Sequence, residues 1–173
     1  MKVAQRSDQR IITQDEPRRA ERRPAAVWPL LVIMAILALG GAVGGVSFIV
    51  DPTGAGLDAQ LSWLDETPVN DFVLPGLFLL GVYAIGTSIL MAGLIWRPSP
   101  GRLRGLDGWL GHHWSWAGTM LVGAILIAWI VYEFAIFPET IALQPILIGV
   151  GTLMIAIPLL PSMRSYYIWH GKG

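Results

Sequence analysis

The strongest constraint on this chain is a set of four long apolar runs separated by short polar segments. They lie at about residues 27–50, 72–96, 115–137 and 142–161. An α-helix rises about 1.5 Å per residue, so about 20 apolar residues cross a hydrocarbon core about 30 Å thick. Inside that core the backbone must satisfy its own hydrogen bonds, which favours helices. Each run is therefore predicted to be a transmembrane helix.

The composition agrees with a membrane protein. Hydrophobic residues make up 54% of the 173 residues and charged residues only 14%, against about 25% charged in ordinary soluble domains. A soluble core of this length would leave too much apolar surface in water. The predicted fold is all-α: a polytopic membrane protein whose four transmembrane helices, within residues 27–163, form an up-down-up-down bundle.

The loop between the first two runs is acidic. Its leucines Leu57, Leu61 and Leu64 recur at helical spacing, which predicts a short amphipathic helix at the interface with Trp63 as an anchor. We expect its acids on a solvated outer face; a cation site is the alternative, although no EF-hand spacing is present. The loop contains no Lys or Arg, and its five acids are Asp51, Asp58, Asp65, Glu66 and Asp71.

The distribution of basic residues predicts the orientation. Seven of the 12 Lys and Arg precede the first run, three lie in the loop at 97–113 and two follow the fourth run, whereas the other two connections have none. The positive-inside rule then places both termini in the cytoplasm. Arginine, alanine and glycine are abundant, which we interpret as a bacterial composition and hence a multi-pass protein of the bacterial inner (plasma) membrane.

Both ends of the chain are predicted to lie outside the bilayer core. Residues 1–26 are polar and are expected to be disordered, and residues 164–173 form a basic, aromatic interfacial tail. The arginines near the end of the first segment act as a topology signal and are also suited to bind anionic lipid headgroups. They are Arg18, Arg19, Arg22 and Arg23.

Glycines in the first run indicate close helix packing. Gly40, Gly41, Gly44 and Gly45 form two overlapping small-xxx-small pairs. Such pairs let another helix backbone approach closely in lipid. Packing within this bundle is the favoured interpretation, and homodimerisation is the alternative.

Glu133 is the only ionisable residue well within an apolar run. An acid in hydrocarbon is costly and is a functional-site hypothesis by default. It lies near the outer end of its run, at a depth comparable to Gln144 across a tight turn, so we expect a hydrogen bond between the two; Asp51 and Asp71 are further candidates for this site. Two interpretations stay open: a structural polar contact, or binding of a proton, a cation or another ligand.

Several kinds of chemistry are not predicted. The chain has no cysteine, which excludes disulfides, thiolate metal sites and iron–sulfur clusters. The adjacent pair His112 and His113 points in two directions on a helix, so no metal site is expected. The histidines lie on the cytoplasmic side and most acids on the other, which disfavours Ser/His/Asp catalysis. No cofactor is expected, and the acids of the N-terminal tail disfavour nucleic-acid binding.

Three stretches carry a resemblance. They are GGVSFIVDPTGAGL at 44–57, ETPVNDFVLPGLFLLGVYAIG at 66–86 and LQPILIGVGTLMI at 143–155. Together they resemble a widespread set of small bacterial four-span membrane proteins of unknown function. The resemblance implies a four-helix membrane protein and carries over no catalytic residue, because none is assigned in that set; the shared motifs are turn and packing residues.

The leading functional hypothesis is a non-enzymatic accessory or scaffold component that contacts another membrane subunit or a second copy of itself, besides the lipid bilayer. The first alternative is a small transporter or channel that uses Glu133 with Gln144. The second alternative is a membrane enzyme that processes lipid at the cytoplasmic face through His112 or His113. These three hypotheses make different demands on the tertiary structure.

Overall fold

The structure is a computed structural model that describes residues 23–65, 67–98, 104–136 and 142–168. These residues are helical or lie in short connections, and none of them belongs to a β-strand; a single antiparallel bridge joins His112 and Ile168. The predicted all-α class is therefore confirmed for this part of the chain. The predicted disordered segment lies almost entirely outside the described residues, as do Arg18, Arg19 and Arg22.

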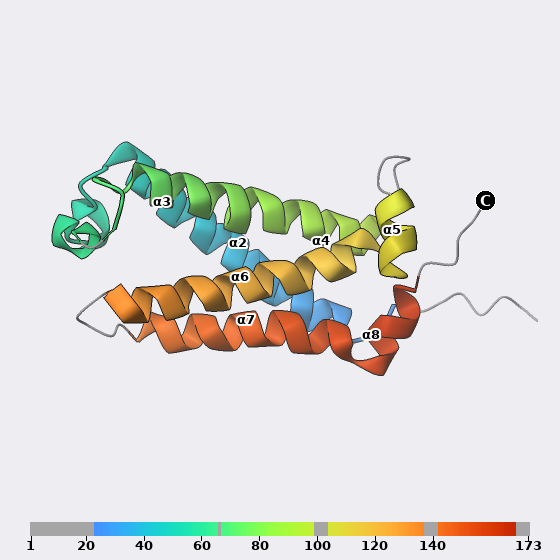
Figure 1. The fold of residues 1–173 in the computed structure, drawn as a ribbon. Helices are drawn as coiled ribbons and strands as arrows, with labels where there is room; N and C mark the ends of the chain where they lie inside the picture. Colours follow the sequence, from blue (N-terminus) through green and yellow to red (C-terminus); the bar gives the residue numbers. More distant parts are fainter. Residues whose placement is uncertain (1–22, 66, 99–103, 137–141, 169–173) are drawn as a thin grey trace, which may run out of the picture.

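Consecutive long helices run in opposite directions along the molecule (Figure 1). Two short helices, α5 and α8, lie at one end, and the loop that follows α2 lies at the other (Figure 1). The elements in order are α2 (Val27–Val50), η1 (Ala55–Leu57), η2 (Leu61–Leu64), α3 (Val73–Phe78), η3 (Leu79–Gly86), α4 (Thr87–Trp96), α5 (Arg104–Leu110), α6 (Trp114–Ile136), α7 (Leu143–Leu159) and α8 (Pro161–Tyr166).

Three of these helices are long and apolar enough to cross a membrane: Val27–Val50, Val73–Trp96 and Trp114–Ala135. The second comprises α3, the π-helical segment η3 and α4. Helix α7 has 17 residues, or about 25 Å, because Leu160 leaves the helical conformation and Pro161 begins α8. The structure thus supports a membrane protein, while a fourth span and the membrane topology stay predictions.

The surface of the long helices is as apolar as their interior. Large apolar side chains such as Leu39, Val43 and Val50 are more than 60% exposed. Soluble proteins rarely expose an apolar surface of this extent to water. The core between the helices is formed by side chains that are at most 2% exposed. They include Leu30, Met34, Leu94, Leu126, Ile130 and Met154.

Glycines permit the closest helix contacts. A Cβ added to Gly45 would lie 2.8 Å from the carbonyl oxygen of Gly76, and one added to Gly41 would lie 2.8 Å from Cβ of Tyr83. These two glycines therefore pack within the molecule, against α3 and η3. A Cβ on Gly44 would touch only a leucine side chain, whereas one on Gly40 would meet nothing within 4 Å.

A second close crossing joins α6 and α7. A Cβ on Gly123 would lie 2.7 Å from the carbonyl oxygen of Gly151, and one on Gly151 would lie 2.8 Å from that of Gly123. Helix α4 packs against both α2 and α6 and so connects the two helix pairs.

The prediction of one short amphipathic helix in the first loop is wrong. The chain instead forms two 3₁₀ turns, η1 and η2, separated by Asp58 at φ 55° and by an extended Gln60. A helix this short has little stability of its own, so the loop folds around its own apolar side chains. Leu64 is consequently buried, while Leu57 and Leu61 are exposed.

Candidate functional site

Glu133 is held near the end of α6 by two neighbours. Trp129, one turn earlier, donates its indole Nε1–H to Glu133 Oε1 at 2.6 Å. The carboxyl group also interacts with the side-chain amide of Gln144, which is only 3% exposed in the first turn of α7. The two side chains therefore lie close together, as the sequence predicted, but the predicted hydrogen bond is not made through Nε2 of Gln144, which is buried and bonds to no atom of the described residues.

Tyr83, which the sequence analysis missed, completes this cluster. It lies in the π-helical segment η3, is 3% exposed, and interacts electrostatically with Glu133. Its hydroxyl oxygen is buried and makes no hydrogen bond. The only signal in the sequence was a tyrosine in the middle of an apolar run, because buried tyrosines usually require a partner for their hydroxyl.

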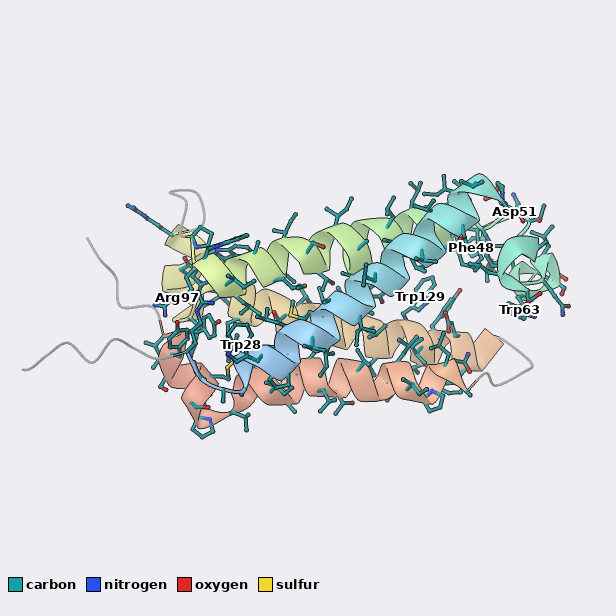
Figure 2. The ribbon with its side chains drawn as sticks, turned by 180° about the vertical axis from the view of Figure 1, so that it is seen from behind. Trp28, Phe48, Asp51, Trp63, Arg97 and Trp129 are labelled. Carbon is teal, nitrogen blue, oxygen red and sulfur yellow. The ribbon has the colours of Figure 1, made fainter. Side chains whose placement is uncertain are left out.

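Aromatic rings surround the same cluster. The Phe78 ring stacks on Trp129 with centroids 4.7 Å apart and meets Tyr83 edge-on at 5.4 Å. A shallow apolar groove of about 390 Å³ lies beside them, lined by Phe78, Ile125, Ala128, Trp129 and Tyr132. Figure 2 shows Trp129 in the half of the molecule that also holds Asp51 and Trp63. The arrangement places a carboxylate next to an aromatic-walled groove.

The two other predicted candidates belong to the loop. Asp51 Oδ1 accepts hydrogen bonds from the Thr53 hydroxyl at 2.6 Å and the Thr53 amide at 3.1 Å, and Oδ2 accepts from the Gly56 amide at 3.1 Å. The Thr53 hydroxyl and the Gly56 amide hold the Asp51 pKa below its ordinary value of 3.8. Asp71 Oδ1 accepts from the Val73 amide at the start of α3 at 3.0 Å. Both carboxylates thus shape their own loop rather than join Glu133.

We call residues 51–65 and 67–72 the acidic knob. Its core contains Ala59, Leu64 and Phe72, and Phe72 stacks on Phe48 of α2 at 4.7 Å. Gly54, at φ 79°, permits the tight turn, since a Cβ there would lie 2.8 Å from the Phe72 ring. The knob is therefore a folded unit that is anchored to the end of α2.

A different cluster fastens the opposite end of the bundle. His113 Nε2 donates to the carbonyl oxygen of Pro98 at 3.1 Å, and its Nδ1 accepts from the Ser115 hydroxyl at 2.7 Å; this tautomer follows from the carbonyl, which can only accept. Asp107 Oδ1 accepts from the Trp114 amide at 2.6 Å and caps α6. We call these residues the helix-end clasp.

The C-terminal segment joins this clasp. The His113 amide donates to the carbonyl oxygen of Tyr167 at 2.9 Å, and the Tyr167 hydroxyl donates to that of Leu94 at 2.8 Å. Burial raises the pKa of Tyr167 to about 12, so the hydroxyl keeps its proton at neutral pH. The guanidinium of Arg97 lies over the Tyr166 ring at 4.4 Å.

The clasp brings Ser115, His113 and Asp107 together, which the sequence analysis did not predict. The geometry differs from a catalytic triad, because the imidazole is oriented by a carbonyl and Asp107 binds a backbone amide. Ser115 and Asp107 are 0% exposed and His113 is 5% exposed, so these side chains are buried rather than presented to a substrate. His112 stacks on Trp116 at 4.3 Å. These contacts favour a structural role for both histidines.

The basic end of the molecule also carries exposed tryptophans. Trp28, Trp96 and Trp109 are 60%, 74% and 82% exposed, as expected for side chains at a membrane interface. Arg23, the described member of the predicted headgroup-binding arginines, donates to the carbonyl oxygen of Ile95 at 2.7 Å. Among the residues that the structure describes, no three His, Asp or Glu side chains gather into a metal site.

Comparison of the chain with protein-family models, with curated proteins and with solved structures gave no match. The resemblance to small bacterial four-span membrane proteins therefore stays a prediction. The two features of the molecule that bear on its function are the acidic knob and the Glu133 cluster.

Proposed function

We propose that this chain is a non-enzymatic accessory or scaffold protein of a bacterial inner membrane, with both termini in the cytoplasm and the acidic knob on the outer face. In this role the knob docks to the outer part of another membrane protein. The observation that carries the proposal is the knob itself, which is folded around its own core although it contributes no residue to the bundle interior.

The knob surface has the chemistry of a docking site. Leu57 and Leu61 are 41% and 44% exposed, and the acids Asp58, Asp65 and Asp71 of the same knob are also exposed. The chain has no Lys or Arg between Arg23 and Arg97 to neutralise this charge. Exposed apolar side chains combined with charged ones are suited to a protein interface, and the sign of the charge selects a basic partner.

Photo-crosslinking in native membranes tests this proposal. A photoreactive amino acid at Leu61, and separately at Leu57, is expected to form one adduct of the same mass. A matched probe at Val43, an exposed position on α2, should label only lipid. The adduct should disappear in the double variant Asp58→Lys with Asp65→Lys. A failure to form a protein adduct at either leucine, or the same adduct from Val43, would contradict docking through the knob.

The Glu133 cluster supports a second candidate function, a small transporter or channel. The supporting observation is that three elements, η3, α6 and α7, bring Tyr83, Glu133 and Gln144 together inside an apolar bundle. The test is proton-coupled or cation flux in proteoliposomes. Wild-type flux above that of empty liposomes, lost in Glu133→Gln and kept in Asp71→Asn, is the expected result. Flux at the level of empty liposomes for all three proteins would eliminate this candidate.

A further inference from the structure

We infer that the aromatic groove beside Glu133 is a binding site for a lipid-soluble organic cation. The apolar part of the ligand lies against Phe78, Trp129 and Tyr132, and its positive charge lies at the Glu133 carboxylate. The inference deepens the second candidate function and rests on it for the use of Glu133, but it concerns binding alone.

The groove has walls suited to such a ligand. Three of its five lining residues are aromatic, namely Phe78, Trp129 and Tyr132. Aromatic faces attract cations, most strongly where water is excluded. Trp129 forms a wall of the groove and also holds Glu133 Oε1 at 2.6 Å, so the carboxylate lies directly beside the aromatic surface. Glu133 itself does not line the groove, but Trp129 joins the two, so the charge of a ligand on these rings can be directed toward the carboxylate.

The charge of the site selects a cation. Residues 24–96 and 114–163 contain no Lys, Arg or His, so the apolar helices supply no positive group for Glu133. Its polar neighbours Trp129, Gln144 and Tyr83 are neutral. A carboxylate in an apolar environment either takes up a proton or stays ionised beside a positive charge, and a bound cation would provide that charge. A water molecule would supply a hydrogen bond but not the charge.

The Tyr83 hydroxyl and the backbone conformation around it give a second indication of a ligand site. The Tyr83 hydroxyl is buried without a hydrogen bond and within the electrostatic influence of Glu133, and a bound ion is one explanation for such a group in a native structure. Tyr83 also lies in the π-helical segment Leu79–Gly86. Segments of this kind are rare and frequently occur at functional sites. Tyr83 does not line the groove itself, but its ring meets that of Phe78, which does, edge-on at 5.4 Å.

The experiment measures binding to the purified protein in lipid nanodiscs by equilibrium dialysis. The probe is tetraphenylphosphonium, and its uncharged counterpart is triphenylphosphine oxide. We expect saturable binding of the phosphonium with one site per chain, and at least about tenfold weaker binding in Glu133→Gln. Tyr132→Leu should also weaken binding. Asp71→Asn, an exposed acid on the knob, should bind as the wild type does.

Two results would overturn the inference. One is the absence of saturable phosphonium binding. The other is equal affinity for the charged and uncharged probes that does not depend on Glu133, which would mean that the groove only holds apolar molecules. If Glu133→Gln does not fold, Tyr132→Leu still distinguishes a site in the groove from binding elsewhere. Phosphonium binding without flux in proteoliposomes would sustain the inference and reject the transport function.

Discussion

At the scale of single residues, His113 makes the stability of the molecule sensitive to pH. Burial lowers the pKa of His113 below 6.5, against opposing effects of the Pro98 carbonyl and Asp107. Protonation would also remove the acceptor that Nδ1 offers to Ser115. Because the unfolded chain binds this proton more readily, the stabilisation is complete above about pH 6.5 and declines as the pH falls below that value. We predict a lower Tm at about pH 5 than at about pH 7.5.

Matched variants at His113 and at His112 test whether His113 causes the pH dependence of Tm. His113→Gln should reduce the difference in Tm between the two pH values for the detergent-solubilised protein. His112→Gln should preserve the difference in Tm. The His112 ring stacks on Trp116, whereas the hydrogen bonds to Ser115 and Pro98 belong to His113. An unchanged pH response in His113→Gln would show that other groups cause it.

At the scale of elements, the two faces of α2 differ in how they tolerate a methyl group. In Gly45→Ala the new Cβ would lie 2.8 Å from backbone atoms of Gly76 and Leu80, so the helices must separate, at a cost of about 1–3 kcal/mol. In Gly40→Ala nothing lies within 4 Å, and helix propensity favours alanine by about 1 kcal/mol. Unfolding in mixed micelles of a mild detergent and dodecyl sulfate should therefore shift in opposite directions. Equal effects of the two variants would contradict the observed packing.

At the scale of the whole molecule, the absence of native cysteine allows a direct test of the proposed orientation. Ser62→Cys lies on the acidic knob and Gly105→Cys on α5, and both positions are exposed at opposite ends. A membrane-impermeant maleimide should label the first variant in intact spheroplasts and the second only after permeabilisation, following the positive-inside rule. Labelling in the reverse order would place the knob in the cytoplasm and contradict the docking proposal.

The sequence by itself determined the helical class, the apolar helices and the charge of the knob. Helix length and hydropathy are sums over neighbouring residues, so they can be calculated without knowing the fold. The contact between Glu133 and Gln144 was also predictable, because a short connection between 137 and 142 brings the ends of two antiparallel helices together. These features depend on residues that are close in the chain.

Only the tertiary structure decided which side chains meet across the bundle. Helices that are apolar on all sides carry little information about their rotation, so the sequence could not show that Gly45 faces α3 while Gly40 faces outward. Neither the π-helical segment that carries Tyr83 nor the hydrogen bond between His113 and Pro98, which lie 15 residues apart, follows from a local sequence pattern. The same holds for the knob, where burial of Phe72 and Leu64 overrode a helical spacing of leucines, because contacts distant in sequence outweigh a weak local preference.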